Sequence, residues 1–216
     1  MIRLEKLSAP VWLEDNKVTR TKEYLEAPSG AKPTPWRAKE VVAQLKVESA
    51  GKCMYCESFV DDVSYAAVEH VRPKSKFPDQ VLEWGNLGIV CTRCNTNKGS
   101  YWTDDESLTL INPYQDDVEA HLSFHGPMTM ARVGSSRGEN TVRKLQFSQR
   151  VDLLISRAAQ MENLYTLITA WATAEDGSEL KELRAEDVRA AIGKGVEYAG
   201  VLRAFARRSG FPVTGD

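Results

Sequence analysis

The chain has 216 residues, of which 42% are hydrophobic and 27% are charged, and its formal net charge is −2. This composition is typical of a soluble globular protein with room for one sizeable core, or for a small metal module and a helical domain. The near-neutral charge gives no global argument for nucleic acid, and no apolar run approaches the ~20 residues of a membrane span or resembles a signal peptide. We therefore expect a cytoplasmic protein.

The N-terminal part, residues 1–52, is predicted to be an extended segment followed by one helix. Prolines and glycine punctuate roughly the first 30 residues, which favours extended or looped chain. Thr34 and Pro35 then have the residue types of a helix start. Apolar residues follow at roughly helical spacing as far as Gly51, namely Trp36, Val41, Leu45 and Val47.

Four cysteines, the only ones in the chain, form two C-x2-C pairs: Cys53 with Cys56, and Cys91 with Cys94. In a reducing cytosol, such pairs favour zinc over disulfides, and four thiolates close the tetrahedral shell of a structural zinc. The alternative is two buried, reduced cysteine pairs without metal. The zinc reading predicts a compact module over residues 53–102.

Inside that module the sequence predicts strand, loop, strand and helix. The first strand covers residues 67–71 and ends before Pro73, and the second covers residues 87–90 and runs into Cys91. A helix that begins there places Cys91, Asn95 and Lys98 on one face. The first strand then carries Glu69 and His70, and the helix carries Asn95.

Beyond the module, residues 103–140 are predicted to be an irregular acidic connector, and residues 141–216 a helical region. A stripe of Leu154, Ala158, Met161, Tyr165, Ile168 and Ala172 predicts one helix. A second helix is expected over residues 186–208, although Gly193, Gly195 and Gly200 weaken it by about 1 kcal/mol each.

The Glu69-His70 pair, Asn86 and Asn95, interleaved with two zinc knuckles, resemble the motif of the HNH endonucleases of the ββα-metal fold. Residues 69–76, 84–87, 91–99 and 110–114 extend the resemblance to the PtuB family, the HNH component of Septu and some retron anti-phage defence systems. This resemblance implies an α+β fold, in which a zinc-stabilised ββα-metal module is embedded in a mainly α-helical chain. It also implies a DNA substrate and a PtuA-like ATPase partner.

The resemblance assigns His70 as the base that activates water, a role that a neutral imidazole suits at cellular pH. It assigns Asn86 to holding the loop that orients this histidine. Glu69 and Asn95 would supply oxygen ligands for a catalytic Mg2+ or Mn2+. Phosphate contacts are expected from the basic residues around the motif, Arg72, Lys74 and Lys98.

Several alternatives remain open in the sequence. The module could be a catalytically inactive, zinc-stabilised DNA-binding or adaptor module, or a nuclease directed at RNA or tRNA. Asn97 is close enough to Asn95 to replace it as a ligand. Ideal strand alternation also puts Glu69 and His70 on opposite faces, so a bend is expected if both serve one site.

Overall fold

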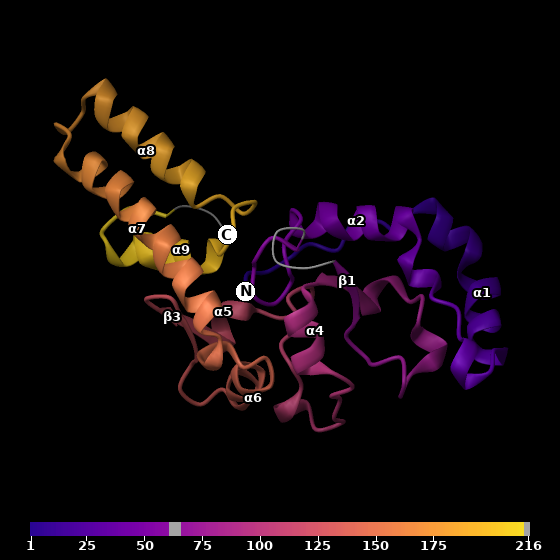
Figure 1. Cartoon of the computed structure of the whole chain (residues 1–216). Coiled ribbons are helices and arrows are strands. Elements are labelled where there is room, and N and C mark those ends of the chain that lie inside the picture. The colour runs from indigo at the N-terminus through magenta and orange to yellow at the C-terminus, as the bar shows by residue number, and fades with distance from the viewer. Residues whose placement is uncertain (61–65, 214–216) are drawn as a thin grey trace.

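The computed structural model describes residues 1–60 and 66–213, and its centre is a two-stranded antiparallel sheet (Figure 1). Strand β1 (Ala67–His70) pairs with β2 (Leu87–Val90), and Glu69 stands opposite Gly88. Helix α4 (Thr92–Lys98) follows β2 directly. The predicted order of strand, loop, strand and helix is therefore present, with β1 one residue shorter than expected.

Strand β2 is the buried centre of the main core. All four of its residues are buried, as expected for the short apolar run Leu-Gly-Ile-Val. Helix α2 (Lys39–Ser49) packs against it and contributes Val41 and Leu45 to the same core. The side chains of β1 and α4 are thus positioned by a strand that is itself enclosed.

The prediction of an extended N-terminal segment is wrong over half its length, because residues 11–26 form helix α1 (Val11–Glu26). Only Leu13 and Tyr24 of this helix are buried, so its apolar periodicity is weak. Pro10 and Pro28 lie outside the helix, and no proline or glycine interrupts it. The prolines flank a helix instead of preventing one.

The helix predicted to start at Thr34 is split in two. Pro35–Arg37 form a short 3-10 turn, Ala38 is extended, and α2 begins only at Lys39. Thr34 makes no side-chain cap hydrogen bond. The remaining 3-10 turns are η1 (Ser29–Ala31), η3 (Pro78–Gln80), η4 (Trp84–Asn86), η5 (Glu106–Leu108) and η6 (Phe147–Gln149).

The connector predicted to be irregular also contains regular structure. It holds α5 (Val118–His121), the hairpin of β3 (Leu122–His125) with β4 (Met128–Ala131), and the start of α6 (Ser136–Lys144). Gly126, at a φ of 58°, makes the hairpin turn. Ser135 belongs to a helix start, because its Oγ caps α6 by accepting from the Gly138 N–H at 3.0 Å.

The C-terminal region is helical as predicted, with differences in detail. Helix α7 (Val151–Thr173) buries Leu153, Arg157, Leu164 and Ile168, so of the predicted stripe only Ile168 is fully buried. The second predicted helix is broken into α8 (Glu179–Ala191) and α9 (Ala199–Arg208), and Gly193 and Gly195 lie in the break. The C-terminal half of α7 pairs with α8 as an arm that projects from the body (Figure 1).

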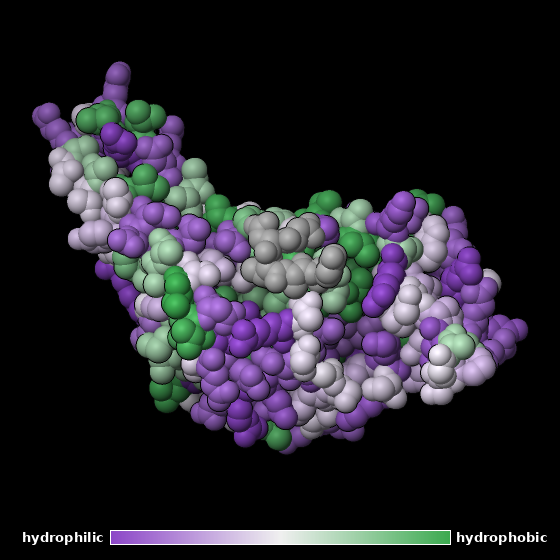
Figure 2. Space-filling model, in the orientation of Figure 1, coloured by the Kyte–Doolittle hydropathy of each residue, from purple (hydrophilic) through white to green (hydrophobic). Residues whose placement is uncertain are grey.

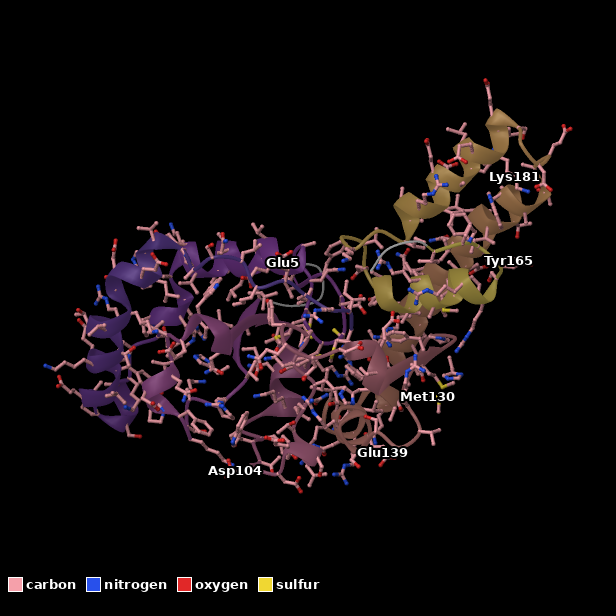
Figure 3. The ribbon with its side chains drawn as sticks, turned by 180° about the vertical axis from the view of Figure 1, so that it is seen from behind. Glu5, Asp104, Met130, Glu139, Tyr165 and Lys181 are labelled. Atoms are coloured by element: carbon pink, nitrogen blue, oxygen red, sulfur yellow. The ribbon has the colours of Figure 1, made fainter. Side chains whose placement is uncertain are left out.

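Figure 3 shows the same arrangement from behind, with Tyr165 and Lys181 on the arm and Asp104 and Glu139 on the body. On the face shown in Figure 2, hydrophilic side chains cover the region over α4 and α6. None of the helices in the described part of the chain combines the length and hydrophobicity that a membrane crossing requires.

The approach of α6 to α5 depends on Gly138. A Cβ atom at this position would lie well inside van der Waals distance of the His121 carbonyl oxygen. In an exposed helix, glycine to alanine stabilises by about 1 kcal/mol. Here we expect Gly138→Ala to lower the free energy of unfolding by about 1–3 kcal/mol, because backbone must move to make room.

Urea denaturation measures this difference. Gly30→Ala is the control, since an added Cβ there meets nothing within 4 Å and the backbone has no positive φ. An unchanged or raised stability in Gly138→Ala would contradict the close approach of α6 and α5.

Candidate functional site

The four cysteines converge on one point in the interior. Cys53 and Cys56 follow α2, Cys91 and Cys94 stand at the start of α4, and all four are buried without disulfides. Their Sγ atoms lie within 4.8 Å of one another, and those of Cys56 and Cys91 are 3.8 Å apart. Thiolates at about 2.3 Å from a tetrahedral zinc lie roughly 3.8 Å apart. The cluster therefore fits a closed metal site with four thiolate ligands.

Backbone hydrogen bonds attach this cluster to the sheet. The Met54 N–H donates to the Ile89 carbonyl at 3.0 Å, which ties the first knuckle to β2. The Cys94 N–H points at the Cys91 Sγ, 3.5 Å away, so the second knuckle is also the N-terminal cap of α4. A metal held by both knuckles thus fixes where α4 starts relative to the sheet.

A buried arginine that the sequence interpretation missed lies against the cluster. Arg150 Nη1 is 3.2 Å from the Cys94 Sγ, and the guanidinium comes from the residue before α7. The pKa of Arg150 is raised overall. Burial alone would lower it, but attraction to the thiolates of Cys94 and Cys56 is the stronger effect. Four thiolates holding one Zn2+ would carry a net charge of −2, which the arginine would partly balance.

His70 ends β1 with its imidazole held from two directions. Its Nε2 lies 3.1 Å from the Val81 carbonyl oxygen, and the Trp36 ring meets it edge-on, with centroids 4.9 Å apart at 90°. Burial lowers the pKa of His70 to about 4, although the hydrogen bond to Val81 raises it in part. The ring is therefore neutral near pH 7.

The tautomer of His70 follows from its partner. A carbonyl oxygen only accepts hydrogen bonds, so the imidazole proton resides on Nε2. Nδ1 then carries the lone pair. This is the protonation state that a general base requires.

Glu69 forms a buried ion pair with Lys98. Lys98 Nζ is 2.6 Å from Glu69 Oε1, and each side chain is 2% exposed. The lysine also donates a hydrogen bond to the His70 carbonyl at 2.9 Å, and Glu69 Oε1 has no partner besides Lys98 in the described part of the chain. Burial raises the pKa of Glu69, which the nearby charges of Lys98 and Lys74 offset only in part.

This geometry changes the expected role of Lys98. The sequence interpretation made it a phosphate contact, but its ammonium is enclosed and joins α4 to β1. An enclosed ammonium with two protein partners is a structural cation. Lys74 by contrast is exposed and lines the same cavity as His70.

Asn86 holds the loop between the two strands. Its Oδ1 accepts from the Arg72 N–H at 2.7 Å, and its Nδ2 donates to the carbonyls of Arg72 and Gln80, both at 3.1 Å. The Val71 N–H also donates to the Asn86 carbonyl. These contacts fix the chain that leaves His70.

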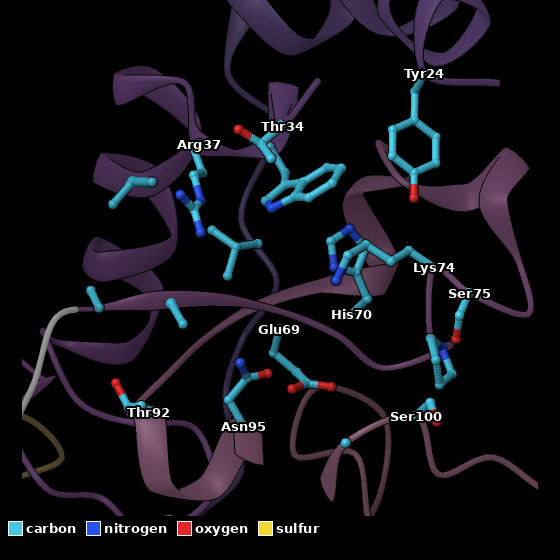
Figure 4. Close-up of a pocket in the computed structure, with 17 residues that line it drawn as sticks. Tyr24, Thr34, Arg37, Glu69, His70, Lys74, Ser75, Thr92, Asn95 and Ser100 are labelled. Atoms are coloured by element: carbon cyan, nitrogen blue, oxygen red, sulfur yellow. The ribbon is translucent and has the colours of Figure 1, made fainter. Parts of the chain in front are cut away.

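A cavity of about 1010 Å³ brings most of these residues together (Figure 4). Glu69, His70, Lys74 and Asn95 all line it, although Glu69 and His70 are neighbours on one strand. Asn97 is directed elsewhere, since its Nδ2 donates to the Leu145 carbonyl at 3.0 Å. The position of Asn95 therefore favours it over Asn97 as a ligand.

Arg72 lies outside the His70 cavity, and three residues that were not predicted lie inside it. Arg72 lines a neighbouring cavity of about 600 Å³, and its guanidinium lies 5.2 Å from the Trp102 ring centroid. Tyr24, Trp36 and Arg37, which the sequence interpretation did not assign to the site, line the His70 cavity. No spacing relative to the cysteines marks them, because α1 and the 3-10 turn reach the site only through the fold.

The comparisons with known proteins agree with the motif. Residues 53–101 match the HNH endonuclease family model. The chain is 30% identical over 158 residues to the Septu protein PtuB of Bacillus thuringiensis, covering 73% of this chain and 58% of that protein. It is 28% identical over 178 residues to the Septu protein PtuB of Bacillus mycoides (strain KBAB4), covering 64% and 60% respectively.

The family match confirms the predicted resemblance to HNH endonucleases over residues 53–101. The two relatives confirm the predicted resemblance to PtuB. The chain spans less than two thirds of the length of both relatives.

Removing one of the four thiolate ligands should abolish zinc binding by the cysteine cluster. A structural zinc contributes about 10–16 kcal/mol at neutral pH, which equals or exceeds the net stability of a typical domain. We expect Cys91→Ser to lose bound zinc and the cooperative unfolding transition of the module. Elemental analysis and thermal circular dichroism measure both, and chelation followed by zinc addition to the wild type is the control. A zinc-free variant that melts like the wild type would contradict a structural metal.

Loss of the Asn86 amide should destabilise the loop without touching the cysteines. Asn86→Ala removes three part-buried hydrogen bonds, two to the backbone of Arg72 and one to the Gln80 carbonyl, so we expect the free energy of unfolding to fall by about 2–4 kcal/mol. Zinc content should stay unchanged. Asn163→Ala, on the exposed side of α7, is the matched control and should change stability by less than about 1 kcal/mol. Equal effects of the two substitutions would refute the holding role.

Proposed function

We propose that this chain is a metal-dependent HNH endonuclease that hydrolyses DNA phosphodiester bonds. One observation carries the proposal. His70 is neutral, with its Nε2 proton directed to the Val81 carbonyl, and it lines one cavity with Glu69, Asn95 and Lys74. A zinc ribbon that only binds DNA needs neither Glu69, His70 nor Asn95.

His70 is the general base in this proposal. Its Nδ1 takes a proton from water as the water oxygen forms a bond to phosphorus and the bond to the 3′-oxygen breaks. A pKa of about 4 keeps the base unprotonated before substrate arrives. The negative charge of an incoming phosphate raises that pKa towards the ordinary value of about 6.5, which strengthens the base when it is needed.

Glu69 and Asn95 would hold the catalytic Mg2+ or Mn2+. The donors fit a hard cation, because one is a carboxylate and the other an amide. The buried Glu69 Oε1 pairs with Lys98 Nζ at 2.6 Å and has no other partner among the described residues, so a bound cation would share this carboxylate with the lysine. When bound, such an ion neutralises the developing phosphate charge and assists the departing 3′-oxygen.

In this proposal, exposed cationic side chains in and beside the cavity bind the phosphate groups of the substrate. Lys74 lines it, and its Nζ lies 5.4 Å from the Trp36 ring centroid. Arg72 follows on the adjoining surface, where its backbone is held by Asn86. Such contacts position a nucleic-acid backbone without reading its sequence.

The remaining assignments support this chemistry from a distance. Asn86 orients His70 through the loop, and the four cysteines hold a structural zinc. The functional module covers residues 53–102, while residues 1–52, 103–140 and 141–216 complete its core and surface.

We further propose that the nuclease acts in the cytoplasm in anti-phage defence, together with a PtuA-like ATPase. Similarity to two proteins named Septu protein PtuB supports this. The projecting arm of α7 and α8 adds surface that the catalytic residues do not use (Figure 1).

Substitution of the base tests the proposal. Incubation with supercoiled plasmid and Mn2+ or Mg2+, alone and with the ATPase encoded by a neighbouring gene, should give cleavage by the wild type. His70→Ala should lower the rate by about 10²–10⁴-fold, with zinc content unchanged. His125→Ala is the control, because this histidine is exposed at the hairpin.

Two outcomes would replace the proposal. Absence of cutting by the wild type under all these conditions favours a non-catalytic adaptor. Preferential cutting of RNA or tRNA in competition with plasmid favours an RNA-directed nuclease.

A further inference from the structure

The 3-10 turn Pro35–Arg37 lies outside the residues that match the HNH model, yet it forms a wall of the His70 cavity. Trp36 and Arg37 both line this cavity, together with Tyr24 from α1 (Figure 4). Trp36 is buried and belongs to the main core, whereas Arg37 is exposed. The turn therefore joins the protein interior to the reacting centre.

Trp36 contacts two of the cavity residues that carry the proposed chemistry. Its ring meets the His70 imidazole edge-on at 4.9 Å, and the Lys74 ammonium lies 5.4 Å from its centroid. Tyr24 also packs against Trp36, with ring centroids 5.5 Å apart at 73°. An edge-to-face contact prefers one orientation of the two rings.

We propose that the Pro35–Arg37 turn is a part of the active site, in which Trp36 is a positioning residue for His70 and Lys74, and Arg37 is a second phosphate-binding cation. This inference rests on the proposed nuclease function.

Two restraints are needed to aim the imidazole. The hydrogen bond from Nε2 to Val81 fixes one ring atom, but the ring can still tilt about that bond. The edge contact with Trp36 removes this tilt and thereby fixes the direction of the Nδ1 lone pair. A general base that is misplaced by about 1 Å loses on the order of 10²-fold in rate.

The aromatic pair does not serve as a platform for bases. Trp36 and Tyr24 are 6% and 5% exposed, so their faces are already covered by protein. Base stacking needs an open ring face. The turn accordingly acts on the chemistry and on the phosphate, not on the identity of the base.

Arg37 completes the cationic side of the cavity. Its side chain is exposed and shares the lining with Lys74. Two cations in one cavity repel each other until an anion lies between them, and a guanidinium matches the geometry of phosphate oxygens. The charge of this wall thus suits a polyanionic backbone.

Steady-state cleavage of supercoiled plasmid with Mn2+ tests Trp36. We expect Trp36→Leu to lower kcat by on the order of 10²-fold with KM nearly unchanged, and Trp36→Phe to recover most of the rate because the ring edge remains. The control is Trp171→Leu, in the separate C-terminal cluster. A kcat for Trp36→Leu no lower than that of Trp171→Leu, at equal folded fraction, overturns the positioning role.

A spectroscopic measurement separates this inference from the proposed function. Nitrogen-15 NMR of the His70 ring should report the Nε2-protonated tautomer in all three proteins, because the Val81 carbonyl is retained. The ring resonances should be sharp in the wild type and in Trp36→Phe, and broadened by exchange between ring orientations in Trp36→Leu. The NMR measurement does not depend on cleavage. If the spectra change as expected but the protein cuts no DNA, the nuclease proposal is wrong and the positioning of His70 by Trp36 stands. An unchanged His70 spectrum in Trp36→Leu defeats the inference alone.

Arg37 has its own test. Arg37→Ala should raise KM several-fold with kcat unchanged, and reduce the salt dependence of KM, while Arg37→Lys restores part of the binding. Lys39→Ala is the matched control, because Lys39 is exposed two residues away and does not line the cavity. Equal KM values for Arg37→Ala and Lys39→Ala would remove Arg37 from the site.

Discussion

The convergence of four thiols on one point determines where the reacting groups lie. The first cysteine pair is bonded to β2 through the Met54 N–H, and the second pair begins α4. Lys98 at the end of α4 adds a second link to the sheet through Glu69 and the His70 carbonyl. A metal held by these four thiols would add to the stability of so small a module. These attachments set the position of the strand that carries His70 relative to the helix that carries Asn95, and both residues line one cavity.

The C-terminal region is bound to the same cluster. Arg157 of α7 donates to the Cys56 carbonyl at 3.2 Å, and Lys52 donates to the Val196 carbonyl at 2.8 Å. The Phe59 N–H donates to the Glu197 carboxylate at 2.7 Å. These contacts come from the first knuckle or its neighbours and reach residues more than one hundred positions away. A displacement of the start of α7, or of the segment between α8 and α9, is thereby coupled to the first cysteine pair, and through it to the sheet that carries His70.

Local chemistry made the centre of the molecule predictable from sequence. Spacing identified the cysteine pairs, short apolar runs identified β1 and β2, and the cysteines defined where α4 begins. Helix α1 was missed because its buried side is only Leu13 and Tyr24, which is too little to create periodicity. The buried face of α7 was predicted wrongly, because a buried arginine, Arg157, occupies a position where periodicity predicts an apolar residue. Trp36 could not be assigned to the site for a similar reason, since its contact with His70 spans thirty-four positions and is made by tertiary packing alone.

The ion pair of Glu69 with Lys98 is the least expected feature, and it explains how a carboxylate can stand at this depth. Burial alone favours the protonated acid, and a protonated acid is a poor ligand for a cation. Lys98 opposes that effect at 2.6 Å while its hydrogen bond goes to the His70 carbonyl. Removing one partner of such a pair leaves the other charge buried and uncompensated, which is costly. The lysine therefore stabilises the ionised form of Glu69 and anchors the backbone of His70 at the same time, so the two side chains of the Glu-His pair depend on one residue of α4.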